Sequence, residues 1–442
     1  MSAEPTARTS ELPGFYRRPI ADRRAFLKEW AGLTDAEVHS LEFPPGVDPG
    51  TIDRMIENVV GVMPLPLGIA TNFRINEREY LVPMAIEEPS VVAAASNAAK
   101  VARASGGFFA QSTAPVMIGQ VQILDVPDPV AARLRLLDRK EELLAAANAK
   151  DPVLVKFGGG AKDLEVRILR SPRGAMIVVH LLVDARDAGG MNAVNTMCEA
   201  LAPEFARLSG GRVVLRIISN LAIHRLARAH AVFPAALLKT DSASGSEVVD
   251  AILDAYALAV ADPFRCATHN KGIMNGVSSV VIATGNDFRA IESGAHTYAA
   301  WRAGESDSGT VVLPLTTYEK DKDGNLVGSI EIPAPVGLIG GATAVHPTAK
   351  TNVKILGVKS ARELGEVLAA VGLAQNFSAL RALATEGIQR GHMELHARNM
   401  AVSAGARPDE VDRVVERLVK DHQVRFDRAK EVLEELRRGG SG

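Results

Sequence analysis

Hydrophobic and polar positions follow two different periods along this chain, so the pattern predicts a mixture of helices and strands. Residues 21–33 keep the helical period, and Thr34 is a candidate N-cap for a further helix. Residues 73–82 alternate on either side of the turn-like pair Asn76 and Glu77, which predicts a β-hairpin.

An alanine-rich helix is predicted next, with Glu88 near its cap, Pro89 at its first position and its end near Ala104. Small side chains along a helix allow another backbone to approach closely. We therefore expect this helix to pack tightly, and a second subunit is one candidate for the surface that it meets.

The stretch from about residue 116 to residue 221 differs from its surroundings in its pattern of strands and helices, which predicts a compact insertion. Its strands and helices follow the order β-α-β-β-α-β of the ferredoxin-like split βαβ unit. The predicted elements are a strand at 116–126, a helix at 128–149, strands at 164–169 and 176–183, a helix at 192–208 and a strand at 212–218.

The chain after this insertion is again mixed. Residues 266–276 are small, polar and rich in glycine, which predicts a loop carrying Lys271; the apolar run at 280–283 predicts a buried strand that ends near Asp287. The remaining predicted elements are a helix at 245–260, a hairpin at 310–333, and helices at 361–371, 376–402 and 409–438.

Composition and charge exclude several classes of protein. The chain has 442 residues, enough for two or three cores, and its net charge of −2 provides no basic field for nucleic acid. Aromatic residues make up 5%, which argues against base-stacking surfaces. The two cysteines, Cys198 and Cys266, cannot form a disulfide framework or a four-cysteine zinc site.

No apolar run approaches the roughly 18–20 residues of a membrane span. The acidic N-terminus also lacks the long apolar core of a signal peptide. We therefore expect a soluble cytoplasmic protein with neither a membrane nor a nucleic acid as its partner.

Lys271 is the first candidate for chemistry. The hydrogen-bonding residues around it suit an anionic or carbonyl-bearing ligand, although a single loop lysine is more often simply solvated. Asp287 would orient that lysine and keep it charged, or it would serve only as a turn residue. Sequence spacing alone leaves both alternatives open.

Two further groups can carry protons. Glu87 and Glu88 precede a predicted helix, where one carboxylate either complements the helix dipole or points inward as an acid. His392 and His396 lie one helical turn apart, but Met393 stands where zinc peptidases need a glutamate. The mismatch argues against a zinc site, so His392 either belongs to a plain amphipathic histidine face or serves as a proton donor near neutral pH.

Glycine-rich segments were compared with nucleotide-binding motifs. Neither GxGxxG nor GxxxxGK[ST] occurs in the chain. Residues 187–192 instead join a predicted strand to a predicted helix, whose free amides would accept a phosphate.

Taken together, six stretches resemble the 3-hydroxy-3-methylglutaryl-CoA reductases, specifically the class II bacterial enzymes. Each stretch alone is weakly specific, but the six follow the family's order along nearly the whole chain. They are residues 56–61, 87–90, 268–276, 283–287, 337–343 and 384–393.

The resemblance implies two hydride transfers that interconvert 3-hydroxy-3-methylglutaryl-CoA with mevalonate plus CoA. The family's catalytic quartet falls on Glu88, Lys271, Asp287 and His392. Lys271 would polarise the carbonyl and Asp287 would orient Lys271. Glu88 would protonate the aldehyde-level oxygen, and His392 would protonate the leaving CoA thiolate.

The resemblance also implies binding residues. Gly189 departs from the family pattern, where a methionine is usual, and Asp151 would repel a 2′-phosphate, which favours NADH over NADPH. No metal is implied. The implied substrate contacts are Ser90, Arg265, Thr268, Asn275 and Asn376. The implied cofactor contacts are Asp151, Asp187, Gly189, Gly190, Asn192 and Asn220.

The implied architecture is an α+β fold with a large mixed helical and sheet domain, an inserted ferredoxin-like small domain and a C-terminal helical flap. Its boundaries are 1–113 and 224–388 for the large substrate-binding domain, 114–223 for the small cofactor-binding domain and 389–442 for the flap. The resemblance further implies a homodimer with its active site at the subunit interface. A higher oligomer built from dimers is also compatible with the resemblance.

Three other functions compete with this hypothesis. A CoA-thioester lyase or hydratase would leave NADH absorbance unchanged. A binding or scaffold protein would keep its function when Lys271 is replaced by alanine. A zinc hydrolase would contain the metal when purified.

Overall fold

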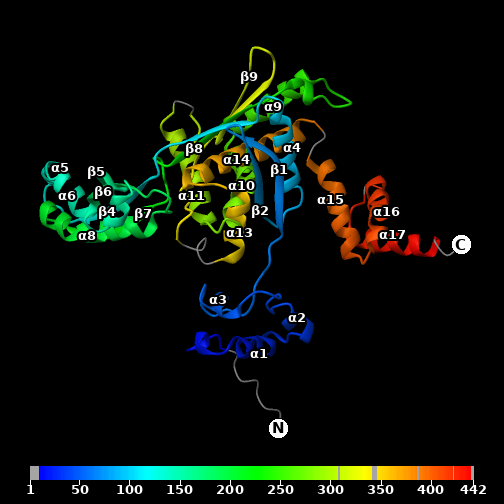
Figure 1. Cartoon of the computed structure of the whole chain (residues 1–442), viewed down its shortest axis with the longest axis horizontal. Coiled ribbons are helices and arrows are strands. Elements are labelled where there is room, and N and C mark those ends of the chain that lie inside the picture. The colour runs from blue at the N-terminus through cyan, green and yellow to red at the C-terminus, as the bar shows by residue number, and fades with distance from the viewer. Residues whose placement is uncertain (1–8, 307–308, 341–345, 386–387, 422, 440–442) are drawn as a thin grey trace, which may run out of the picture. The chain divides into compact units, whose positions relative to one another are not determined.

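The computed structural model describes residues 9–306, 309–340, 346–385, 388–421 and 423–439, and for residues 388–395 the backbone alone (Figure 1). Contacts between residues divide the chain into two compact units, Met1–Pro66 and Leu67–Gly442. The domain boundaries predicted at 113, 223 and 388 stay predictions.

The N-terminal unit is a set of short helices held by a buried arginine. Arg23 donates to Asp53 Oδ1 at 2.6 Å and to the main-chain oxygen of Val59 at 2.8 Å. Thr34 caps its helix through a capping box, which confirms the predicted N-cap. The helices are η1 (Phe15–Arg17), α1 (Ile20–Ala31), α2 (Asp35–His39) and α3 (Pro49–Asp53).

The second unit contains a six-stranded sheet with the order β2-β1-β3-β8-β10-β9. The predicted hairpin is confirmed: Asn76 and Glu77 have φ values of 48° and 66°, as a two-residue type I′ turn requires. The hairpin predicted within 310–333 is also present. The strands are β1 (Leu67–Ile75), β2 (Arg78–Ala85), β3 (Phe108–Ser112), β8 (Leu226–Phe233), β9 (Thr316–Lys320) and β10 (Leu326–Pro333).

One long helix, α14 (Ala361–Ala384), packs against three strands of this sheet and against four helices. By length and composition α14 would suffice to cross a membrane, which corrects the expectation that no segment approaches that size. Most of it is buried inside the fold, as in the core helix of a globular domain. The other helices around this sheet are η2 (Ala235–Leu237), α4 (Val91–Arg103), α9 (Gly245–Ala261), α10 (Pro263–Ala283), α11 (Phe288–Gly304) and α13 (Pro347–Leu356).

Helix α10 contradicts two predictions. Lys271 lies on this helix rather than in a loop, and residues 280–283 form its last turn rather than a strand. Gly276 reflects close packing, because a Cβ there would lie 2.9 Å from the Cβ of Gln375 on α14, whereas a Cβ on Gly272 would meet open space. Pro89 also precedes its helix, since α4 begins only after the N-cap Ser90.

The predicted β-α-β-β-α-β order is present as a four-stranded antiparallel sheet with the order β5-β6-β4-β7. The helix predicted at 128–149 is broken at Arg139, where the backbone leaves the helical region. The elements are β4 (Val116–Leu124), α5 (Pro129–Asp138), α6 (Lys140–Asn148), α7 (Pro152–Lys156), β5 (Gly160–Ser171), β6 (Gly174–Asp184), α8 (Met191–Ser209) and β7 (Arg212–Ser219).

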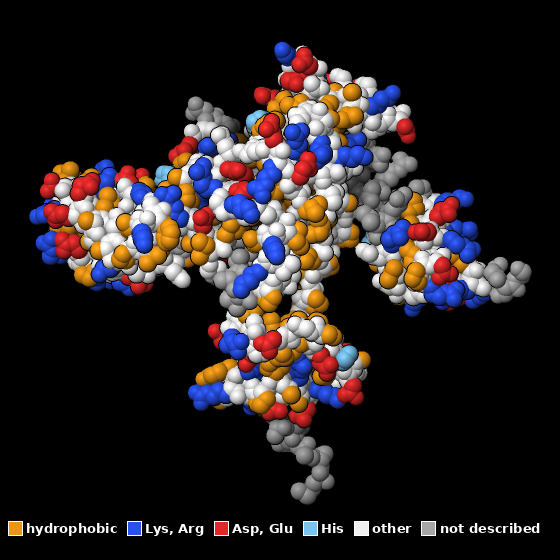
Figure 2. Space-filling model, in the orientation of Figure 1, with side chains coloured by type: hydrophobic (Ala, Val, Ile, Leu, Met, Phe, Trp, Pro, Cys, Tyr) orange, Lys and Arg blue, Asp and Glu red, His pale blue; other side chains and the backbone are white. Residues whose placement is uncertain are grey.

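Three C-terminal helices form a separate small core. Buried apolar residues of this core include Ala397, Val414, Leu418 and Leu433. Charged side chains of both signs cover the visible face of these helices (Figure 2). The single helix predicted at 409–438 is two helices. The elements are α15 (Ile388–Ser403), α16 (Pro408–Lys420) and α17 (Phe426–Gly439).

Candidate active site

A cavity of about 630 Å³ lies between α10, the start of α4 and the C-terminal half of α14. It brings together residues that the sequence places far apart. The predicted site residues on its wall are Glu88, Ser90, Arg265, Thr268, Lys271 and Asn275.

Helix α10 supplies four of these side chains from one face. These residues are Arg265, Thr268, Lys271 and Asn275, and they are spaced by three or four positions. That spacing places their side chains above one another on one face of the helix. Asp262 starts the helix and accepts a hydrogen bond from the backbone of Arg265 at 3.0 Å. A helix capped in this way holds the four side chains in a fixed row.

Glu88 reaches the same row from the connection between β2 and α4. Its Oε2 lies 3.2 Å from Lys271 Nζ and accepts from Asn275 Nδ2 at 3.3 Å. The side chains of Lys271 and Glu88 are 61% and 36% exposed. An ion pair this exposed adds little to stability, so the pair is better suited to chemistry than to folding.

Two polar atoms on the cavity wall, Ser90 Oγ and Gln375 Oε1, are buried and have no hydrogen-bond partner among the described residues. Ser90 also has a φ of 75°, which is rare for a residue with a side chain. A buried polar atom without a partner costs about 1–3 kcal/mol, so both atoms are candidates for ligand contacts. Gln375 was not among the predicted site residues, and its one sequence cue is its polarity within an apolar helix.

Asn376 faces away from the cavity. Its Oδ1 accepts hydrogen bonds from Thr316 Oγ1 at 3.0 Å and from the Tyr318 hydroxyl at 2.9 Å. Thr316 lies in turn 2.7 Å from His269 Nε2. This buried network fastens α10 and α14 to β9, and its position lends no support to the predicted substrate contact of Asn376.

Asp287 is the N-cap of α11, which corrects its predicted place at the end of a strand. It accepts from the backbone of Arg289 at 3.0 Å and of Ala290 at 3.3 Å. Between Lys271 and Ala283, α10 advances about 18 Å at 1.5 Å per residue. Within the described part of one chain, Asp287 makes no hydrogen bond or ion pair with Lys271.

His392 lies in α15, but its side chain is outside the described part of the chain. Thr385, which follows the last residue of α14, lines the cavity. The chain therefore leaves the cavity wall shortly before α15 begins. The role predicted for His392 stays a prediction.

The predicted cofactor residues lie in and beside the four-stranded sheet. Gly190 is the N-cap of α8 with a φ of 95°, and no side chain caps this helix. Asn192 is exposed on its first turn. Asp151 caps α7 by accepting from the backbone of Leu154 at 2.9 Å. Asn220 follows the last residue of β7.

The loop before α8 is bound to the six-stranded-sheet region. Asp187 Oδ1 accepts from the backbone of Ala361, the first residue of α14, at 2.8 Å. Gly189 lies next to Gly337, where an added Cβ would come within 2.5 Å of the Gly189 nitrogen. Four of the predicted cofactor residues therefore share one loop and helix start, at 187–192.

A model of the hydroxymethylglutaryl-coenzyme A reductase family matches residues 19–397 of this chain. The chain belongs to that family. The curated reductase of Archaeoglobus fulgidus is 59% identical over 98% of this chain and 96% of its own length. A probable reductase of Borreliella burgdorferi is 34% identical over 86% and 84%.

Solved structures place the reductase among class II members. The reductase of Streptococcus pneumoniae is 40% identical, covers 96% of this chain and 99% of its own, and has a TM-score of 0.74. A structure of that class II enzyme bound to NADPH covers 95% and 100%, with a TM-score of 0.73. The resemblance and the α+β fold class are confirmed, and the chain is an NAD(P)H-dependent oxidoreductase.

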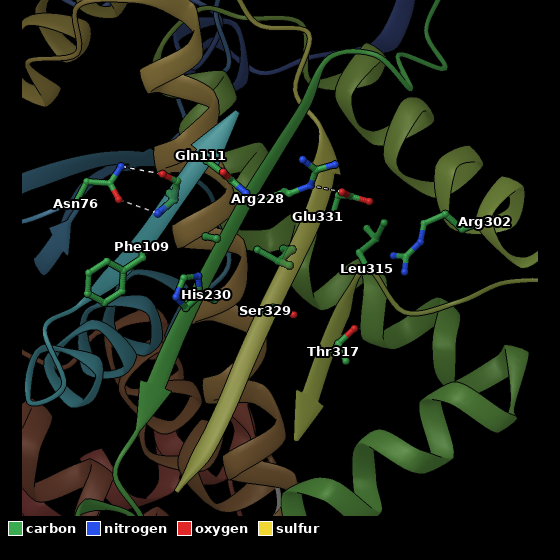
Figure 3. Close-up of a pocket in the computed structure, with 13 residues that line it drawn as sticks. Asn76, Phe109, Gln111, Arg228, His230, Arg302, Leu315, Thr317, Ser329 and Glu331 are labelled. Atoms are coloured by element: carbon green, nitrogen blue, oxygen red, sulfur yellow. Dashed lines mark hydrogen bonds and ion pairs between the residues drawn. The ribbon is translucent and has the colours of Figure 1, made fainter. Parts of the chain in front are cut away.

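A second hollow of this reductase, of about 530 Å³, lies on the open face of the six-stranded sheet (Figure 3). Arg228 and Glu331 form an ion pair on its floor, and Tyr298 donates to the same carboxylate. None of the predicted site residues lines it. Within the described ranges, no group of three or more His, Cys, Asp or Glu side chains is placed to hold a metal ion.

Two buried histidines should make the reductase less stable in acid. Burial lowers the pKa of His269 to about 3 and that of His180 to about 4, from 6.5. Below pH 6.5 the unfolded chain takes up protons that the folded chain does not. We expect the free energy of unfolding to fall by about 1 kcal/mol per pH unit for each histidine between pH 6 and pH 4.5.

Urea denaturation at a series of pH values measures this dependence. His180→Gln should remove one histidine's share of the slope. Equal slopes for the wild type and His180→Gln would contradict the prediction.

Proposed function

We propose that this reductase interconverts 3-hydroxy-3-methylglutaryl-CoA and mevalonate plus CoA through two hydride transfers. The observation that carries the proposal is the convergence of Lys271, Glu88 and Asn275 on the wall of one cavity of about 630 Å³. A bound nicotinamide cofactor would supply the hydride. The chain's own residues would supply charge and protons.

Lys271 polarises the reacting carbonyl in this proposal. Hydride addition to the thioester, and later to mevaldehyde, places negative charge on the carbonyl oxygen. An ammonium group held on a capped helix stabilises that charge without reorganising during the reaction. Its hydrogen bond with Glu88 fixes the direction in which the ammonium points.

Glu88 delivers the proton to the aldehyde-level oxygen. Lys271 and Asn275 both donate to its Oε2, and among the described residues no donor binds its Oε1. Oε1 is therefore the atom that would face the substrate with a proton. Because Asn275 is neutral, it holds the carboxyl group in place in either protonation state.

Asp287 orients Lys271 from a second copy of the chain. Within one chain α10 separates the two residues by about 18 Å of helix axis, so the proposed contact requires Asp287 of the partner subunit. The active site then lies at the interface of a homodimer, and a higher oligomer would be built from such dimers. We place the enzyme in the cytoplasm, because Cys198 and Cys266 are both free thiols.

His392 protonates the departing CoA thiolate. A thiol with a pKa of about 8.5 leaves more easily as the thiol than as the anion, and an imidazole can donate a proton near neutral pH. The helix that carries His392 follows the cavity wall directly in sequence. Movement of that helix as a flap would bring the donor to the site and exclude water.

Arg265 binds the substrate carboxylate, because its planar guanidinium donates two parallel hydrogen bonds. It lies on the same helical face as Lys271. Ser90 Oγ and Gln375 Oε1 gain hydrogen-bond partners when the substrate is bound. Thr268 adds a hydroxyl to the wall, and Asn376 remains a predicted contact.

The residues at the start of α8 fit a dinucleotide. A helix start without a side-chain cap presents free amides to a pyrophosphate. A side chain on Gly190 would collide with Ala185, at 2.9 Å from its Cβ, so a glycine is needed there. Asp187, Gly189 and Asn192 complete this turn, and Asn220 lies at the exit of β7.

Asp151 selects NADH in this proposal. Its carboxylate would accept hydrogen bonds from the ribose hydroxyls and repel a 2′-phosphate. Asp151→Ser should therefore lower the KM for NADPH and raise that for NADH, shifting the ratio of kcat/KM toward NADPH by at least about tenfold. Steady-state kinetics with each cofactor measures the shift, and an unchanged ratio would remove Asp151 from cofactor selection.

The proposed function is tested by following nicotinamide absorbance with 3-hydroxy-3-methylglutaryl-CoA and with NADH or NADPH in turn. Oxidation with at least one cofactor and release of free CoA thiol are expected. No oxidation with either cofactor would sink the proposal.

A further inference from the structure

Arg225 is a buried arginine that binds main-chain oxygens. It immediately precedes β8, is 4% exposed, and makes no ion pair with a carboxylate in the described part of the chain. Its guanidinium donates to Ala188 O at 3.0 Å, to Gly189 O at 3.4 Å and to Arg186 O at 3.4 Å. A further bond goes to Val336 O.

The same loop is also held by residues 336–339. The main-chain oxygen of Asp187 accepts from Leu338 N at 2.8 Å and from Ile339 N at 3.2 Å. Ala188 pairs with Ile339 as an isolated parallel bridge. Residues 186–189 are therefore held both by the guanidinium of Arg225 and by a second backbone segment, which Arg225 also binds at Val336 O.

The hydrogen bonds that Arg225 makes with this loop contribute little to the stability of the fold. Burying a guanidinium is costly, and the hydrogen bonds of Arg225 go to neutral carbonyl groups, while the charges of Asp184 and Asp187 act on it without forming an ion pair. Burial lowers the pKa of Arg225 to about 10, so it stays charged at neutral pH. The planar guanidinium of an arginine has five N–H donors in fixed directions, whereas the ammonium group of a lysine has three at a single point.

We infer that Arg225 and residues 336–339 form a clamp that positions the 186–189 loop, and with it the first amides of α8, for the pyrophosphate of the cofactor. The inference rests on the proposed function, since it assumes that the start of α8 holds the cofactor. Arg225 acts through the loop and is a positioning residue. An error of about 1 Å in such amides weakens hydrogen bonds to a phosphate substantially.

Two variants each disturb one part of the clamp, either the guanidinium of Arg225 or the backbone segment 336–339. Arg225→Lys keeps the charge but loses the fork, and Gly337→Ala adds a Cβ that would lie 2.5 Å from Gly189 N and 2.9 Å from Ala188 C. For each variant, the Kd for NADH and NADPH is measured by fluorescence titration, and the KM for 3-hydroxy-3-methylglutaryl-CoA by steady-state assay. We expect the Kd of the preferred cofactor to rise at least tenfold, with the substrate KM changed less than twofold.

Arg362→Lys is the matched control. Arg362 also donates to a main-chain oxygen, that of Ser112 at 2.7 Å, but it does not touch the 186–189 loop. Both of its constants should stay at the wild-type values. Variants of the clamp that lower the melting temperature but leave cofactor Kd unchanged would overturn the inference. A wild type that does not oxidise either cofactor would instead overturn the proposed function.

Discussion

Lys271→Met should lower kcat by about a hundred- to a thousandfold while leaving the melting temperature within about 1 °C of the wild type, because the loss of one preorganised oxyanion donor costs about 3–4 kcal/mol. Methionine keeps the length of the side chain but removes its charge. The side chain is 61% exposed, so the fold does not depend on it. Both reduction of the thioester and reduction of supplied mevaldehyde should fail, since each passes through an oxyanion.

Lys100→Met is the control for this substitution. Lys100 is an exposed lysine on α4, the helix that starts at the cavity, and its replacement should leave kcat unchanged. A loss below about tenfold for Lys271→Met would show that another group stabilises the oxyanion.

Much of the fold follows from local pattern. Asn76 favours the predicted turn because asparagine tolerates a positive φ, and the surrounding alternation fixes the hairpin although Glu77 also takes a positive φ. The β-α-β-β-α-β order could also be predicted, because the period of the hydrophobic positions changes between that of a strand and that of a helix at recognisable boundaries. The break at Arg139 was not predicted, since charged helix-forming residues continue on both sides of it.

The helical conformation of Lys271 was not predictable from local propensity. Gly272, Gly276 and Asn275 disfavour a helix, and the apolar run that follows is typical of a strand. Tertiary packing reverses this preference: α14 approaches Gly276 so closely that a side chain there would collide with Gln375. The residue that packs against Gly276 lies almost a hundred positions away in the sequence, so no local pattern reveals this contact.

Which residues belong to the site was easier to predict from the sequence than how their side chains are oriented. Family motifs placed six predicted residues that the cavity then brought together. Position along a motif does not report which way a side chain points, and Asn376 turns into the core beside Thr316 and Tyr318. Gln375, one residue earlier, lines the cavity instead.

Two inactive variants of this enzyme should restore activity when they are combined. Lys271→Met and Asp287→Asn should each abolish activity in homodimers, since every site then lacks one member of the pair. If Lys271 from one chain meets Asp287 of the partner subunit, a heterodimer of the two variants contains one intact site and one doubly altered site. Random reassociation makes half of the dimers mixed, so about a quarter of wild-type activity should return.

The measurement is kcat per subunit after the two variants are mixed, dissociated and reassociated, with each variant carried alone through the same treatment. Asp287→Asn keeps the helix cap, because the amide oxygen can still accept from the backbone of Arg289 and Ala290. Loss of activity therefore reports on the missing charge and not on a frayed α11. If both variants are inactive and their mixture stays inactive although heterodimers form, then Asp287 acts within its own chain, and α10 and α11 must rearrange to bring it to Lys271.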